Sequence, residues 1–449
     1  MTTLEIYDTT LRDGTQQEGI SLTAGDKLTI SRLLDELGVA YIEGGWPGAN
    51  PKDDEFFKRA QTELDLDTAT LVAFGSTRRA GSSAENDAQL AALVAAETEV
   101  VCLVGKSWDY HVEHALRTEQ QEAIAMIGDS VEYLRSLDRR VFFDAEHFFD
   151  GYRTNPEFAL ATLRAARDSG AERLVLCDTN GGTLPHDVER VIGEVSAALP
   201  DAGLGCHFHN DAGTAVANSL TAASAGIRQI QGCVNGYGER TGNADLCSVI
   251  PNVSLKMGYT SIPDDRLSHL TRVSHHIAEI INLTLDDHLP YVGVSAFTHK
   301  AGLHTSALAR RPDAYEHLPP ESVGNTTRTV VSELAGRSTI LAKAQDTGLE
   351  LTSEEAQLVV DRIKQLEHEG YHFEAADASF ELLVREAQGW TQPFFTLESY
   401  RVFVEHREGA VVAEATVKVH VGRERIVTTR EGDGPVAAID LALRAALSD

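Results

Sequence analysis

The chain has 449 residues, 42% of them hydrophobic, which leaves room for a large core and two or three domains. Its formal net charge of −29 would repel phosphate backbones, so we do not expect nucleic-acid binding. The N-terminus has no basic patch before an apolar run, and no later segment is apolar enough for a membrane span, so we expect a cytoplasmic protein without membrane contact.

Short β-rich runs alternate with longer helical patterns through the first half of the chain. Eight strands are predicted, at residues 4–9, 40–45, 68–74, 99–105, 140–147, 172–179, 203–210 and 228–234. One of the helices predicted between them begins after Thr23 as N-cap and ends before Gly38. This alternation predicts an α/β fold, with a (β/α)₈ TIM barrel over residues 1–262. A doubly wound open sheet is the alternative, but no Gly-x-Gly-x-x-Gly follows the first strand.

Polar side chains gather where the predicted strands end. In a TIM barrel the carboxyl ends of all strands meet at one mouth, which carries the chemistry. The candidates at these ends are Arg12, Asp13, Asp144, Glu146, His147, Asp178, Thr179, Asn180, His207, His209, Asn210, Asp211, Glu239, Arg240 and Asn243. We therefore expect a single active site at the barrel mouth.

The most specific pattern at these ends is His-Phe-His-Asn-Asp, residues 207–211. Alternate residues of a strand share a face, so His207 and His209 should both face the mouth while Phe208 packs outward. Two imidazoles with a carboxylate from across the barrel, for which Asp13 is the natural candidate, would bind a divalent metal and leave positions open for substrate. The alternative is a polar layer in which both histidines are satisfied by hydrogen bonds.

Four motifs in this order resemble one enzyme family: "YDTTLRDGTQQEG", "HFHNDAGTAVANSL", "GYGERTGNADL" and "FTHKAGLHTSAL". They are similar to the isopropylmalate, homocitrate and citramalate synthases, which are metal-dependent acyl-CoA condensing enzymes on a TIM barrel, and to related aldolase-type lyases. The resemblance covers nearly the whole chain. Two further stretches, "EGGWPGANPKDDEFF" and "GKSWDYHV", look most like the citramalate synthase branch.

The resemblance implies a Claisen-type condensation of acetyl-CoA with a 2-oxo acid, which is pyruvate in the citramalate branch that leads toward isoleucine. The acid would chelate a divalent cation (Mn²⁺, Mg²⁺ or Zn²⁺), which polarises its keto group. Asp13, His207 and His209 would hold this cation, with Asn243 as a further ligand by resemblance. Arg12 would stabilise the alkoxide that forms at the keto oxygen.

The condensation also needs a base that removes a methyl proton of acetyl-CoA. Glu146 is one candidate, although it could instead be a salt-bridge partner of Arg12 or Arg240. The resemblance adds His304, which in the family comes over the active site, often from the partner subunit. Glu146 and His304 together would then handle the proton.

Substrate selection is expected at the same mouth. The resemblance implies that Thr179 hydrogen-bonds the substrate carboxylate. A pocket for pyruvate must close around a methyl group, and we expect Leu103, with Phe74 or Phe142, to exclude bulkier acids. Trp46 after the second strand is compatible with a small substrate, but it could equally pack a helix onto the barrel.

Two regions follow the barrel. Residues 263–392 are mainly helical in pattern, with the clearest helix after Thr352 and before Gly370. The resemblance implies a linker subdomain that carries His304 and crosses to a second subunit, which predicts a homodimer. Residues 393–449 alternate like strands and end in a helix, which predicts a small α+β domain similar to half of the family's regulatory domain. We expect this domain to be incomplete, which puts end-product feedback in doubt.

Three alternatives stay open for the function. An isopropylmalate or homocitrate synthase, or a specialised-pathway homologue that uses another 2-oxo acid, would keep every motif. A retro-aldol lyase needs no acetyl-CoA, and the helical extension with His304 argues against it. A non-catalytic homologue would be expected to lose part of the set Arg12, Asp13, His207 and His209, which is complete here.

Overall fold

The computed structural model describes residues 2–448, except 301–303, 305, 306, 308–310, 333, 375, 391–393 and 408. The chain divides into two compact units. The first comprises residues 1–299 and 307–328, and the second comprises residues 300–306 and 329–449. No helix in the described part of the chain is long and apolar enough to cross a membrane.

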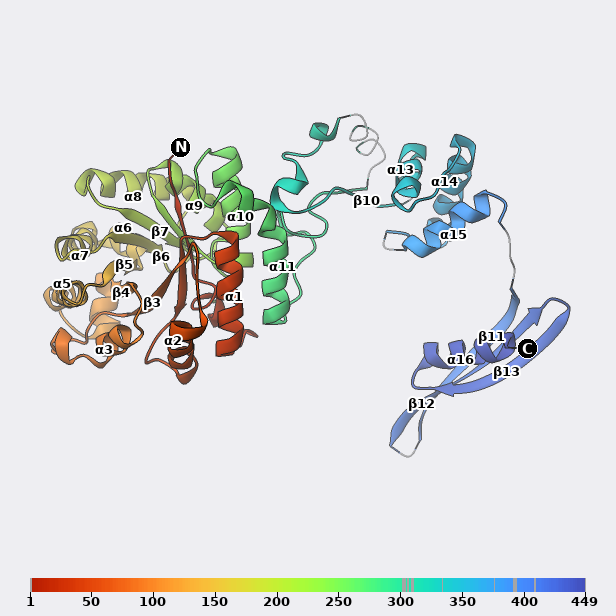
Figure 1. Cartoon of the computed structure of the whole chain (residues 1–449), viewed down its shortest axis with the longest axis horizontal. Coiled ribbons are helices and arrows are strands. Elements are labelled where there is room, and N and C mark those ends of the chain that lie inside the picture. Colours follow the sequence, from red (N-terminus) through yellow and green to blue (C-terminus); the bar gives the residue numbers. More distant parts are fainter. Residues whose placement is uncertain are drawn as a thin grey trace. The chain divides into compact units, whose positions relative to one another are not determined.

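The first unit contains a closed barrel of eight strands in sequential order (Figure 1). The strands are β1 (Glu5–Asp8), β2 (Tyr41–Gly45), β3 (Thr70–Ser76), β4 (Val100–Lys106), β5 (Arg140–Glu146), β6 (Arg173–Asp178), β7 (Leu204–Phe208) and β8 (Gln229–Gly232). All pairs are parallel, and β8 pairs with β1 to close the barrel. The predicted TIM barrel is therefore confirmed, and each observed strand lies within two residues of its predicted bounds.

Helices surround the strands (Figure 1). They are α1 (Ala24–Leu37), α2 (Pro51–Glu63), α3 (Ala88–Ala95), α4 (Asp109–His111), α5 (Gln120–Ser136), α6 (Phe148–Thr154), α7 (Pro156–Asp168), α8 (Pro185–Ala198), α9 (Ala215–Ser224), α10 (Leu246–Pro251) and α11 (Leu270–Ile281). The predicted ends of α1 are confirmed. Thr23 and Asp26 form a reciprocal capping box at its start, and Gly38 ends it in the left-handed conformation, with a φ of 90°.

Alternate strand residues divide between two apolar layers, because successive side chains of a strand point to opposite faces. The barrel interior is filled by Tyr7, Tyr41, Val72, Phe74, Val100, Cys102 and Phe142. The intervening residues join the larger core between strands and helices, among them Leu103, Phe143 and Phe208. The outward packing predicted for Phe208 is confirmed, since its ring lies 5.6 Å from that of Phe149 in this layer.

The second unit contains a helical part and a sheet part. The helices α13 (Arg337–Asp346), α14 (Ser353–His368) and α15 (Asp377–Ala387) share a small core that includes Ile340, Val360 and Phe380. The strands β11 (Thr396–Arg407), β12 (Ala410–Val421) and β13 (Glu424–Gly432) form an antiparallel sheet, against which α16 (Pro435–Leu447) packs. The predicted helix after Thr352 and the strands followed by a helix are confirmed.

Candidate active site

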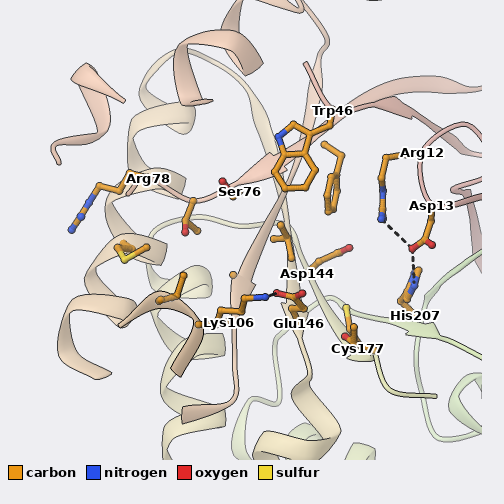
Figure 2. Close-up of a pocket in the computed structure, with 18 of the residues that line it drawn as sticks. Arg12, Asp13, Trp46, Ser76, Arg78, Lys106, Asp144, Glu146, Cys177 and His207 are labelled. Atoms are coloured by element: carbon orange, nitrogen blue, oxygen red, sulfur yellow. Dashed lines mark hydrogen bonds and ion pairs between the residues drawn. The ribbon is translucent and has the colours of Figure 1, made fainter. Parts of the chain in front are cut away.

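The mouth of the barrel holds a cavity of about 500 Å³ (Figure 2). Most of its lining comes from the ends of seven strands and the residues that follow them, and the lining includes Arg12, Asp13, Trp46, Phe74, Ser76, Arg78, Val104, Lys106, Asp144, Glu146, Cys177, Thr179, His207 and His209. Six of the predicted site residues are thus brought to one cavity. This convergence follows from the parallel barrel, in which every strand delivers its last residues to the same face.

Asp13, His207 and His209 form a cluster whose ligand atoms all lie within 4.8 Å of one another. Asp13 Oδ2 is 3.5 Å from His207 Nε2 and 3.8 Å from His209 Nε2. Asn243 lies beside them, because its backbone forms a β-bridge with His209.

Several buried polar atoms of this cluster are left without hydrogen-bond partners. Asp13 Oδ1, His209 Nδ1 and Asn243 Oδ1 have no hydrogen-bond partner within the part of the chain that the structure describes. Leaving buried polar atoms unsatisfied costs free energy, so a native structure normally supplies a partner. Oxygen and imidazole donors in this arrangement suit a divalent cation, so the residues present fit a metal.

Electrostatics favour the same conclusion. Burial, together with the neighbouring His209, lowers the pKa of His207 to about 3, so its imidazole is neutral near neutral pH. Burial opposes ionisation of Asp13, but Arg12 and the two histidines outweigh it and hold the pKa of this carboxyl well below its usual range. Burial also lowers the pKa of His209. The cluster therefore offers neutral imidazoles and a carboxylate, the forms that bind metals.

Gln231 on β8 orients His207. Its Oε1 lies 3.1 Å from His207 Nδ1, and its Nε2 donates to Asp144 Oδ1 at 2.9 Å. Because an amide oxygen only accepts, His207 carries its proton on Nδ1, which leaves the lone pair of Nε2, on the side of Asp13, available to a cation. Sequence reasoning missed this residue, although the alternation of Gln229 and Gln231 on a barrel strand signals inward-facing polar groups.

Arg12 is fixed by a carboxylate and an aromatic ring. Its Nε donates to Glu43 Oε1 at 2.5 Å, and its Nη1 donates to Asp13 Oδ2 at 3.0 Å. Its guanidinium also stacks on Phe74, 3.9 Å from the ring centroid. Glu43 is completely buried and accepts a hydrogen bond from the Tyr7 hydroxyl at 2.6 Å. The guanidinium is thus held rigidly beside the proposed metal ligands.

Glu146, the candidate base, forms an ion pair with Lys106 on the neighbouring strand (Figure 2). The sequence left open a pairing with Arg12 or Arg240, but the structure pairs both arginines with other carboxylates. Sequence reasoning missed Lys106, although it is the last residue of β4 and so meets the strand-end criterion.

Thr179 follows β6 at the cavity. Its Oγ1 accepts a hydrogen bond from the backbone N–H of His147 at 2.9 Å. A hydroxyl whose oxygen already accepts keeps its hydrogen for another partner. Thr179 can therefore donate to an anionic group in the cavity.

The expectation that Leu103 contacts the substrate is corrected by the structure. Leu103 is completely buried in the layer between strands and helices, whereas Val104 lines the cavity. Phe74 also lines it, with Trp46 packed edge-on against its ring at 5.2 Å. Phe142 lies deeper, in the barrel interior.

His304 lies in the second unit, at an exposed helical position. Its neighbours at 301–303, 305 and 306 lie outside the described residues. The proposed partnership between His304 and Glu146 therefore stays a prediction.

Comparison with known proteins places this geometry in a family. Residues 3–277 match the HMGL-like family model, residues 291–371 the homocitrate synthase post-HMGL domain-like model, and residues 374–449 the LeuA allosteric (dimerisation) domain model. The chain is 53% identical to the (R)-citramalate synthase of Streptomyces coelicolor over 448 residues, which span 98% of this chain and 83% of that enzyme. The chain belongs to the HMGL-like family, within its (R)-citramalate synthase branch.

Two further comparisons agree with this membership. The (R)-citramalate synthase of Synechocystis sp. is 52% identical over 464 residues, which span 100% of this chain and 84% of that enzyme. Among solved structures, a Bacillus subtilis HMG-CoA lyase superimposes with a TM-score of 0.55 at 20% identity, covering 64% of this chain and 96% of that one. That similarity shows the fold that the family shares.

Proposed function

We propose that this enzyme is an acyltransferase that condenses acetyl-CoA with pyruvate to give (R)-citramalate and CoA, a step toward isoleucine. The observation that carries the proposal is the similarity, over nearly the whole chain, to enzymes named (R)-citramalate synthase. The cavity supports it, because a metal-type cluster, an arginine and a candidate base converge there. A homodimer is the expected assembly, supported by the match to a dimerisation domain.

Asp13, His207 and His209 hold the divalent cation in this proposal, with Asn243 Oδ1 as a further ligand. When bound, a divalent cation acts as a Lewis acid on the keto group of the 2-oxo acid. The unpartnered oxygens of Asp13 and Asn243 support this assignment. Gln231 keeps His207 in the tautomer that leaves Nε2 free to bind.

Arg12 and Thr179 orient and stabilise the 2-oxo acid. The guanidinium of Arg12, held by Glu43 and Phe74, stabilises negative charge as it develops on the keto oxygen. Thr179 donates its hydroxyl hydrogen to the substrate carboxylate, since its oxygen already accepts from His147. Both groups are held in place before the substrate binds, so little free energy is spent on reorganisation.

Glu146 is the base in this mechanism. A carboxylate oxygen of Glu146 takes a methyl proton from acetyl-CoA, and the resulting carbanion attacks the keto carbon. His304, by resemblance to the family, shares the handling of this proton. Hydrolysis of the thioester then releases CoA.

The apolar wall of the cavity selects the 2-oxo acid. Phe74, Val104 and Trp46 line the cavity, and in this proposal the methyl group of pyruvate packs against them. One additional methylene in such a pocket changes the free energy by only about 1–3 kcal/mol. Isopropylmalate or homocitrate synthase activity is therefore the alternative, because the chemistry would be the same and only this wall would differ.

A thiol-release assay with acetyl-CoA and Mg²⁺ or Mn²⁺ tests the proposal. Pyruvate, 2-oxobutyrate, 2-oxoisovalerate and 2-oxoglutarate are compared at equal concentrations. We expect the highest kcat/KM with pyruvate. Preference for any of the other three acids would refute the citramalate assignment, and absence of CoA release with all four would refute the condensation.

A further inference from the structure

Lys106 and Glu146 are the last residues of β4 and β5. The two strands pair in register at these residues, and the backbone N–H of Ser107 donates to Glu146 O at 3.0 Å. Lys106 Nζ forms an ion pair with Glu146 Oε2 (Figure 2). The two side chains are 23% and 24% exposed and both line the cavity. A flexible cation is thus held beside the proposed base by a rigid pair of strands.

Among the described residues that line the cavity, the other lysine or arginine side chains are Arg12, Arg78 and Arg79. Arg12 and Arg78 are each held by two carboxylates. Arg79, in the loop after β3, is exposed. Among these cations, Lys106 is the one that contacts Glu146, so it is the one placed to respond when Glu146 loses its charge.

Deprotonation of acetyl-CoA moves a negative charge over a short distance. The C–H bond of the methyl group breaks, its proton forms an O–H bond with the Glu146 carboxylate, and the electron pair enters an enolate whose charge resides mainly on the thioester oxygen. The negative charge leaves Glu146 as it appears on the substrate. A cation within reach of both positions stabilises the charge before and after the transfer.

We propose that Lys106 is a further catalytic residue, whose ammonium group donates a hydrogen bond to the thioester oxygen of acetyl-CoA as Glu146 takes the methyl proton. An ammonium has three rotatable N–H donors on a flexible stem, so one can reach the oxygen while another stays with Glu146. Arg12 stabilises the alkoxide that forms later on the 2-oxo acid. The two cations therefore stabilise two negative charges that develop one after the other. This inference rests on the proposed condensation.

A purely structural ion pair is the competing explanation. Half-exposed or exposed ion pairs stabilise proteins by about 0–1 kcal/mol, so losing one would lower the unfolding temperature slightly and leave the chemical step unchanged. Lys106→Met removes the charge and keeps the apolar stem, whereas Lys106→Arg keeps the charge. Lys343→Met is the matched control, because Lys343 pairs with Asp377 at 2.8 Å and its side chain is 20% exposed.

The experiment measures CoA release with pyruvate, together with the kinetic isotope effect for methyl-deuterated acetyl-CoA, on full-length enzyme with Mg²⁺. We expect Lys106→Met to lower kcat about 100-fold, with the KM for pyruvate changed less than about threefold. The isotope effect on kcat should rise, because deprotonation becomes more rate-limiting. The kcat of Lys106→Arg should be at least about tenfold higher than that of Lys106→Met, and the kcat of Lys343→Met should match that of the wild type.

Two outcomes would overturn the role of Lys106. One is a kcat of Lys106→Met within about threefold of wild type, and the other is a lower kcat without a larger isotope effect. Thermal unfolding is recorded in parallel, and Lys106→Gln replaces the Met variant if that variant does not fold. Wild-type enzyme is assayed first: if it releases no CoA with any 2-oxo acid, the proposed function itself fails, which is a different result from failure of Lys106 alone.

Discussion

Replacing Gln231 by Met should weaken metal binding although Gln231 is not a proposed ligand. The substitution removes the acceptor that lies 3.1 Å from His207 Nδ1, in a residue that is only 4% exposed. An unsatisfied buried N–H costs about 1–3 kcal/mol. His207 avoids this cost by moving its proton to Nε2, but that tautomer blocks the nitrogen facing Asp13. Either way we expect Mn²⁺ affinity to fall by about 10–100-fold.

Isothermal titration with Mn²⁺ near neutral pH measures this loss directly. Gln229→Met is the matched control, because Gln229 lies two residues earlier on the same strand and its amide donates to Glu5 instead. We expect Gln229→Met to bind Mn²⁺ within about threefold of wild type. Equal affinity of Gln231→Met and wild type would refute the tautomer argument. Equal losses in both variants would show that the effect comes from barrel stability.

Other consequences can be measured independently. Burial raises the pKa of Asp8 to about 7 despite its hydrogen bonds from Thr10, so the folded state keeps a proton that the unfolded state releases near pH 4. The free energy of unfolding of the wild type should therefore fall by up to about 4 kcal/mol as the pH rises from about 4 to 7. Asp8→Asn, which cannot ionise, should lack this fall. Urea unfolding of both proteins across this range checks it, and parallel pH profiles would contradict it. Val104→Ala should raise the kcat/KM ratio of 2-oxobutyrate to pyruvate by about tenfold or more, and an unchanged ratio would remove Val104 from the selecting wall. Chelator should lower the unfolding temperature of wild type, because a cation that binds only the folded state stabilises it, whereas Asp13→Asn should respond less.

The barrel and part of its site could be predicted from the sequence, because the patterns that indicate them lie within short segments of the chain. Strand and helix periods repeat eight times, and a His-x-His on a strand marks one face by its polarity. The proposed ligand pair His207 and His209 could therefore be assigned to the mouth from the sequence alone. The polar strand ends added Arg12, Asp13, Glu146 and Thr179 to the same cavity.

The choice between Leu103 and Val104 could not be made from sequence. From Val100 to Gly105, β4 is buried on both faces, so these residues are apolar or small and give no alternating pattern. Shifting the register of a strand by one residue exchanges its two faces. Only the register of β4 in the barrel decides whether Leu103 or Val104 faces the interior.

Side-chain contacts between strands also could not be predicted from the sequence. Lys106 meets Glu146 because β4 and β5 pair at these residues, and Glu43 reaches Arg12 from another strand. Such pairs depend on the register between strands, which the spacing of residues along one strand does not predict. The strand-end and inward-facing positions of these residues could have nominated them, but not their partners.

The most direct test of the account is CoA release from acetyl-CoA and pyruvate before and after metal removal, with citramalate identified by mass spectrometry. We predict that chelation abolishes the activity, that Mg²⁺ or Mn²⁺ restores it, and that Asp13→Asn lacks it at the same metal concentration. Full activity after complete metal removal, or in Asp13→Asn, would contradict the assignment of Asp13, His207 and His209 as the metal site on which the proposed condensation depends.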